Sequence, residues 1–202
     1  MPEAAFRRAI RDYIAREARP ADKFGHQPRL YALTLQVGAG LDYDDDIVFA
    51  AAWLHDIGVF IGHRPEDPEE LARWDNVAYA VETAPAVLES LGFPCEKISA
   101  VAEAIRTHQP AAHPTTIEGT ILRDADILEQ LGAIGVLRTV CKVGRDTRFT
   151  DFTSAVAAMR KALATLPAYI RLDTTRGLAA PRIRMLEAFL AAVEAEAQPD
   201  LF

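Results

Sequence analysis

An adjacent histidine and aspartate, His55 and Asp56, have the residue types and the placement that a metal site needs. They follow a run of small apolar residues in the stretch AAAWLHDIG (50–58), which ends at Gly58. Imidazole and carboxylate are both ligands of first-row metals, and the end of one helix could present both to one ion. The apolar run predicts a buried helix that stops near the pair. A pair of this kind is also compatible with a core histidine beside a helix cap, so further ligands are needed.

Other candidate ligands stand at the ends of expected helices, where side chains of different helices can meet. His26 opens an expected helix, and His55 and His108 each close one. In the helical segment LRDADILEQLG, Asp124 and Asp126 lie about 200° apart around the axis, so one ion is not expected to bind both. The apolar periodicity indicates that Asp124 is the more buried of the two. It does not identify the ligand.

Apolar residues recur with a period near 3.6 along almost the whole chain, which predicts one all-α domain spanning residues 1–202 with about seven to nine helices. The expected helices cover 3–18, 26–37, a segment ending at 55, a short helix within 59–76, 77–91, 96–108, 117–144 with a break at LGAIG, 153–166 and 181–196. The expected helix caps are the acidic residues 44–46, Thr115 or Thr116, and Thr153 or Ser154, with Pro181 at a first helical position.

Composition excludes several classes of partner. The net charge of −7 offers no basic field for duplex DNA or an anionic membrane surface. The longest apolar run, 47–54, is far shorter than the ~20 residues of a membrane span, and the charged N-terminus does not resemble a signal peptide. The two cysteines lack the spacing of a zinc site, which favours reduced thiols. We therefore expect a cytoplasmic protein.

The order and spacing of four residues resemble the HD-domain superfamily of metal-dependent phosphohydrolases, whose motif is a histidine, a His-Asp pair and a distant aspartate. The match is His26 in KFGHQPRLYAL, His55 and Asp56 in AAWLHDIG, and Asp126 in LRDADILEQLGAIG. Members typically have Ala-Asp and, one residue later, leucine at the last ligand, so the resemblance assigns Asp126 rather than Asp124. It covers about residues 20–145 and implies an HD-like helical bundle, with helices in 153–196 packed on it.

The resemblance implies a divalent metal ion: Mn, Fe, Ni, Co, Zn or Mg. Dinuclear HD enzymes have a further metal-binding histidine between the pair and the position of His108, and the segment RWDNVAYAVETA has none. One ion held by His26, His55, Asp56 and Asp126 is therefore the expected site.

The implied reaction is hydrolysis of a phosphoester or phosphoanhydride bond in a small phosphorylated substrate, with a nucleotide as one candidate. Asp56, His108 and His63 are the candidate catalytic residues, although His108 could simply end its helix and His63 could lie in an exposed loop. The candidate phosphate-binding cations are Lys23, Arg145 and Arg148, each of which could equally be a surface charge.

Other functions on the same scaffold remain open. An HD-type metal-dependent oxidase or lyase would use the same kind of ligands, and a non-catalytic module would bind a ligand without turnover. The apolar C-terminal helix could pack internally or form the seam of a homodimer.

Overall fold

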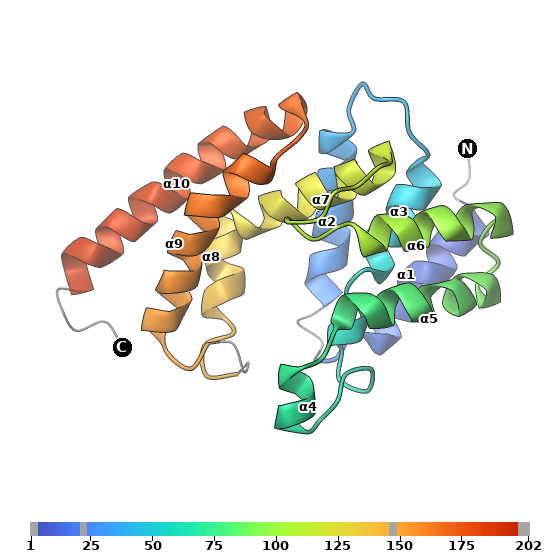
Figure 1. The fold of residues 1–202 in the computed structure, drawn as a ribbon, viewed down its shortest axis with the longest axis horizontal. Coiled ribbons are helices and arrows are strands. Elements are labelled where there is room, and N and C mark those ends of the chain that lie inside the picture. The colour runs from blue at the N-terminus through green and yellow to red at the C-terminus, as the bar shows by residue number, and fades with distance from the viewer. Residues whose placement is uncertain (1–3, 21–23, 146–148, 198–202) are drawn as a thin grey trace. The chain divides into compact units, whose positions relative to one another are not determined.

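The computed structural model describes residues 4–20, 24–145 and 149–197, which form an all-α fold (Figure 1). The described segments contain ten α-helices, several short 3₁₀ helices and no strand, so the predicted fold class is confirmed. The number of helices is ten rather than nine because the segment from 117 is divided in two. The chain divides into two compact units, residues 1–123 and 124–202. Its organisation as one domain remains a prediction.

The first unit contains six complete helices and the start of a seventh. They are α1 (Ala5–Glu17), α2 (His26–Val37), α3 (Asp45–Leu54), α4 (Pro68–Ala72), α5 (Asn76–Ser90), α6 (Ile98–Arg106) and the start of α7 (Ile117–Gln130), with the 3₁₀ helices η2 (Ile57–Val59) and η3 (Cys95–Lys97). Thr116 accepts a hydrogen bond from the Gly119 N–H at 3.1 Å and is therefore the cap of α7.

Helix α3 is the centre of the first unit. Every residue from Ile47 to Leu54 is buried, and the helix packs against α1, α2 and α6 (Figure 1). A helix that is apolar on all sides is stable when other helices surround it. The apolar run before His55 therefore forms a buried helix, as predicted, and this helix holds His55 in the interior.

Acidic residues at the start of α3 cap the helix and also bind cations. The Asp44 carboxylate accepts the Asp46 N–H at 3.0 Å, which confirms the predicted cap. Arg7 forms ion pairs with Asp45 at 2.7 Å and Asp46 at 2.6 Å, and Lys97 pairs with Asp44 at 2.7 Å. Burial alone would raise the pKa of Asp46, but hydrogen bonds from Arg7 and Lys97 outweigh it and hold that pKa below its ordinary value. The cluster therefore joins α1 and η3 to the start of α3.

The second unit contains the end of α7 and the helices α8 (Gly132–Val140), α9 (Phe152–Tyr169) and α10 (Asp173–Ala197), in which α8, α9 and α10 pack on one another. The predicted break lies at Leu131 and Gly132, where Gly132 has a φ of 78°, a conformation that favours glycine. Among the described residues there is no helix whose length and apolar character would let it cross a bilayer.

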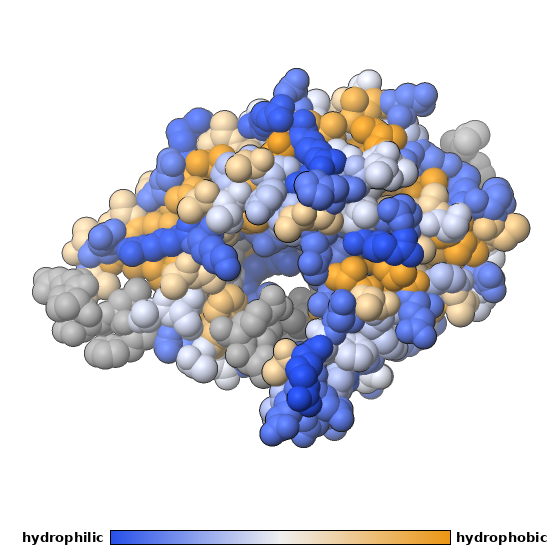
Figure 2. Space-filling model, in the orientation of Figure 1, coloured by the Kyte–Doolittle hydropathy of each residue, from blue (hydrophilic) through white to orange (hydrophobic). Residues whose placement is uncertain are grey.

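Part of α10 lines an apolar groove in the second unit. The groove has a volume of about 360 Å³ and lies between α8, α9 and α10, with Leu137, Phe152 and Phe189 in its lining. Leu137 and Phe152 are 64% and 49% exposed. On the face in Figure 2, such apolar patches alternate with larger hydrophilic areas. A homodimer remains a prediction.

Two helix starts in the second unit differ from the predictions. Helix α9 is capped by Asp151, not by Thr153 or Ser154, because Asp151 accepts the Ser154 N–H at 2.7 Å and forms a reciprocal capping box with Ser154. Helix α10 begins at Asp173, so Pro181 lies inside it and not at its first position. Ala179 and Leu186, on either side of this proline, are buried.

Candidate metal centre

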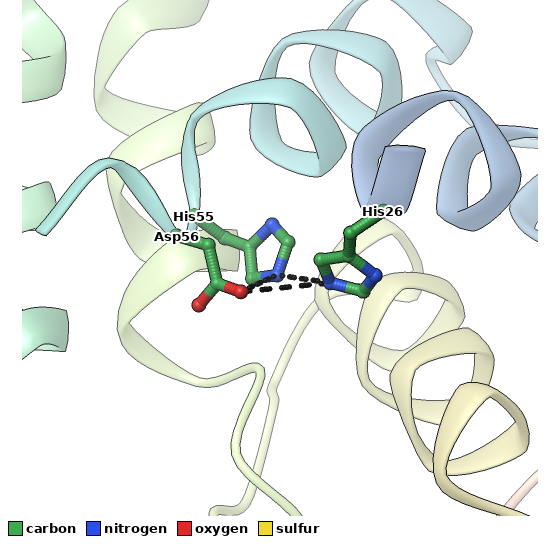
Figure 3. Close-up of side chains that lie close together, drawn as sticks. All are labelled: His26, His55 and Asp56. Carbon is green, nitrogen blue, oxygen red and sulfur yellow. Dashed lines mark hydrogen bonds and ion pairs between the residues drawn. The ribbon is translucent and has the colours of Figure 1, made fainter. Parts of the chain in front are cut away.

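Three of the four predicted ligands lie together in the first unit. His26 is the first residue of α2, His55 is the C-cap of α3, and Asp56 follows at the start of the next turn (Figure 3). The Nε2 atoms of the two histidines are 3.2 Å apart. Asp56 Oδ2 lies 3.6 Å from His26 Nε2 and 3.5 Å from His55 Nε2. One nitrogen or oxygen from each residue thus converges on a common point.

The spacing of these atoms fits a single ion. Ligand atoms about 2.0–2.2 Å from one ion lie about 2.8–3.8 Å apart when the ligand–metal–ligand angles are about 90–120°. The three measured separations fall in this interval. Two imidazoles and one carboxylate are also the donors that Mn²⁺, Fe²⁺, Co²⁺, Ni²⁺ and Zn²⁺ accept, and they leave positions for further ligands.

Hydrogen bonding prepares His55 to bind a metal. Its Nδ1 lies 3.0 Å from the Ala52 carbonyl oxygen, which can only accept, so Nδ1 has the proton and Nε2 keeps its lone pair. His55 is 1% exposed and His26 is 7% exposed, so both imidazoles lie in the interior of the first unit. The Asp56 side chain is 23% exposed, so solvent reaches the centre on the carboxylate side.

The predicted catalytic residue His108 lies beside the centre. It is buried, and its ring centroid is 5.0 Å from that of His55, with the two rings at 74°. Its Nδ1 lies 2.6 Å from the Ile105 carbonyl oxygen, which can only accept, so this nitrogen donates the hydrogen bond. The structure therefore brings His108 to the site, whereas its catalytic role remains a prediction.

The predicted catalytic residue His63 has other partners. Its Nδ1 is 3.0 Å from the Tyr79 hydroxyl, and its Nε2 is 3.1 Å from Glu17 Oε2. These contacts join the loop after η2 to α1 and α5. A catalytic role for His63 remains a prediction.

The two aspartates of the DAD segment occupy different environments within the second unit. Asp124 is fully buried, as the periodicity predicted, and it accepts the Leu172 N–H at 2.9 Å and the Arg171 N–H at 3.2 Å. Asp126 is partly exposed and accepts a hydrogen bond from Gln130 Nε2 at 3.0 Å. These hydrogen bonds attach Asp124 to the two residues that precede α10. Metal binding by Asp126 remains a prediction.

The predicted phosphate-binding cations are only partly covered by the structure. Lys23 and Arg148 lie outside the described residues. Arg145 is exposed in the turn after α8, in the second unit. Their roles in phosphate binding remain predictions.

Trp74 is a residue that no motif or spacing in the sequence singles out. Its indole Nε1–H donates to the Gly58 carbonyl at 2.8 Å, directly after the His-Asp pair. No local pattern could indicate this bond, because the acceptor is a backbone carbonyl 16 positions away. Gly58 itself was expected only to stop a helix, but it also makes a close backbone contact with Asn76.

Comparison with known families and structures identifies several similar proteins. The family model for the HD domain matches residues 24–131, more than half of the chain. No curated protein sequence matches the chain.

The fold is similar to three crystal structures. Bacillus subtilis YpgQ in complex with ADP has a TM-score of 0.73 and 24% identity, covering 96% of each chain. A predicted HD superfamily hydrolase from an uncultured Thermotogales bacterium has a TM-score of 0.64 and 23% identity, covering 94% of this chain and 91% of that one. An HD-superfamily hydrolase from Bacillus thuringiensis has a TM-score of 0.67 and 21% identity, covering 96% and 97%. At such identities the similarity establishes the fold.

Proposed function

Because the chain belongs to the HD-domain family, we propose that it is a metal-dependent phosphohydrolase. Its substrate would be a small phosphorylated molecule with a phosphoester or phosphoanhydride bond. The observation that supports this proposal is the convergence of His26, His55 and Asp56 on one point with separations that fit one ion. The donor set is the one that hydrolytic metal sites use.

Each residue of the centre has a defined part in the proposed reaction. A divalent ion, when bound, would lower the pKa of a water molecule and neutralise charge on a phosphate oxygen. His26 and His55 would hold it as neutral imidazoles, and Asp126 would be the fourth ligand. Asp56 has a second carboxylate oxygen, and that oxygen can accept a hydrogen bond from the attacking water and orient it.

His108 is the proposed general acid. The hydrogen bond from its Nδ1 to Ile105 orients the ring, and Nε2 is the nitrogen that would carry the transferred proton. Its ring lies beside that of His55, so Nε2 belongs to the same part of the first unit as the metal ligands. A proton held there could pass to the leaving oxygen as the phosphorus–oxygen bond breaks.

We propose a nucleotide as the substrate class. The structure of YpgQ, a protein of the same fold, contains ADP. Because the chain has a net charge of −7, phosphate binding needs local cations, for which Lys23, Arg145 and Arg148 are the candidates.

The test is a hydrolysis assay over nucleotides and sugar phosphates with each divalent metal in turn. We expect release of phosphate or pyrophosphate with at least one combination of substrate and metal. This release should be lost in Asp56→Asn. The matched control is Asp12→Asn, which changes a carboxylate that is 61% exposed on α1. The proposal would be contradicted if no combination of substrate and metal gave turnover, or if Asp56→Asn kept full activity.

An oxidase is the second candidate, since two histidines and one carboxylate are also the ligands of non-haem iron oxygenases. It predicts turnover that requires Fe²⁺ and dioxygen and consumes oxygen. Oxygen uptake measured in the same screen distinguishes the two activities. A non-catalytic binding module predicts that nucleotides bind, by calorimetry, without any turnover.

A further inference from the structure

The turn that contains Asp56 is held by the segment that starts α5. Asp56 lies beyond the last turn of α3, with φ −104° and ψ 14°, and its carbonyl accepts the Val59 N–H at 3.0 Å. This bond closes η2. His55 differs, because its ring is held by its own helix through Ala52. The position of the Asp56 carboxylate therefore depends on where η2 lies.

Two contacts fix η2 against residues 74–76. The Trp74 indole donates to the Gly58 carbonyl at 2.8 Å. A Cβ added to Gly58 would lie 2.6 Å from the Asn76 carbonyl oxygen and 2.9 Å from its Cα. The two backbones are thus in direct contact, and only glycine allows the approach.

The segment that holds η2 is itself well anchored. Asp75 caps α5 by accepting the N–H groups of Val77 at 3.0 Å and Ala78 at 2.9 Å. The Trp74 ring packs on Tyr79 of α5, with centroids 5.3 Å apart. Helix α5 in turn packs on both η2 and α6. Trp74 thus connects the turn after the metal ligands to a helix with its own support.

We propose that Trp74 is a positioning residue for the metal centre, and that its hydrogen bond to Gly58 places Asp56 opposite His26 and His55. The inference rests on the proposed metal site. Outer hydrogen bonds of this kind typically change metal affinity by about 10–100-fold. Trp74 acts through a backbone two residues from the ligand, so we expect the lower end of that range.

The test compares Trp74→Phe with Trp53→Phe. Both changes remove an indole N–H and keep an aromatic ring, but the buried Trp53 Nε1 has no hydrogen-bond partner. We expect Mn²⁺ affinity, measured by calorimetry, to fall about 10-fold in Trp74→Phe and to stay within about twofold in Trp53→Phe, since no bond is lost. Equal affinities in wild type and Trp74→Phe, or equal losses in both variants, would overturn the inference.

A second measurement uses the metal-free protein. Hydrogen exchange of the Val59 amide should become about 10-fold faster in Trp74→Phe, while amides in α6 remain unchanged. Unchanged exchange at Val59 would refute the coupling between Trp74 and the turn. If the wild type bound no metal at all, the proposed function would fail, and the exchange result would still test that coupling.

A second variant approaches the same contact from the other side. Gly58→Ala places a methyl group against the Asn76 backbone, and we expect a larger loss of Mn²⁺ affinity than in Trp74→Phe. Gly177→Ala is the control, because a Cβ at that position would meet nothing within 4 Å. An affinity of Gly58→Ala equal to that of Gly177→Ala would contradict the inference.

Discussion

The two aspartates of the DAD segment should respond in opposite ways to loss of charge. Asp124 is fully buried and accepts the backbone N–H groups of Arg171 and Leu172 ahead of α10. Asp126 is partly exposed and is the ligand that the HD motif assigns. We therefore expect Asp124→Asn to destabilise the fold and Asp126→Asn to weaken metal binding.

The size of the Asp124 effect follows from its hydrogen bonds. Bonds to a charged group contribute about 1.5–3 kcal/mol each, and the longer bond to Arg171 adds less than the bond to Leu172. Asparagine keeps one acceptor oxygen but directs an NH₂ group where the second oxygen was. We expect the free energy of unfolding to fall by about 2–3 kcal/mol, which for a chain of 202 residues lowers Tm by about 4–12 °C.

Thermal unfolding of the metal-free proteins and Mn²⁺ titration of the folded ones measure the two effects separately. Asp126→Asn should keep a Tm within about 3 °C of wild type, because a partly exposed side chain contributes little to stability, and should bind Mn²⁺ at least about 10-fold more weakly. The reverse result, with a stable Asp124→Asn that no longer binds metal, would refute this division of roles. It would make Asp124 the ligand.

Three further outcomes are expected. His108→Asn should lower kcat about 10²–10³-fold because the general acid is lost, while calorimetry shows unchanged metal affinity; a normal kcat would exclude His108 from proton transfer. The pKa of Asp46 is lowered in the folded state. The contribution of Asp46 to stability is therefore complete when the pH lies above its pKa in the unfolded chain, about 3.9, and it is lost as the pH falls through its pKa in the folded protein. The difference in urea stability between wild type and Arg7→Leu should therefore be constant from about pH 6 to 8 and shrink below about pH 4, and a difference that persisted in acid would argue against an ionic origin. Burial and the hydrogen bond to Asp45 raise the pKa of Tyr31 to about 12, so ultraviolet titration should show one phenol fewer ionising at high pH in Tyr31→Phe, and loss of a group with an ordinary pKa would contradict this.

The sequence alone predicted most of the helices and three residues that the structure brings together, His26, His55 and Asp56. A period of 3.6 reports which face of a helix is buried, and this is a local property of the chain, so α2 was predicted from His26 to Val37, as observed. The apolar run before His55 likewise predicted the buried helix α3. His26, His55 and Asp56 stand at helix ends, which is visible in the sequence. The order and spacing of the HD motif then group them as one set of candidate ligands.

Helix starts were less predictable where several capping residues competed. The segment before α9 offers Asp151, Thr153 and Ser154 within four positions, and only the folded backbone selects Asp151. Pro181 is compatible with either a first or an interior helical position. The folded chain has it in the interior, because α10 begins eight residues earlier, at Asp173.

The tertiary structure alone decided how residues far apart in the chain act on each other. Periodicity predicted that Asp124 is buried, but its partners at Arg171 and Leu172 are 47 and 48 positions away. Trp74 is not distinguished by the sequence, because a tryptophan that donates to a backbone carbonyl looks in sequence like any other tryptophan. The candidate metal ligands can thus be identified from residue type and spacing in the sequence. Their support depends on backbone contacts between distant segments, and these exist only once the chain has folded.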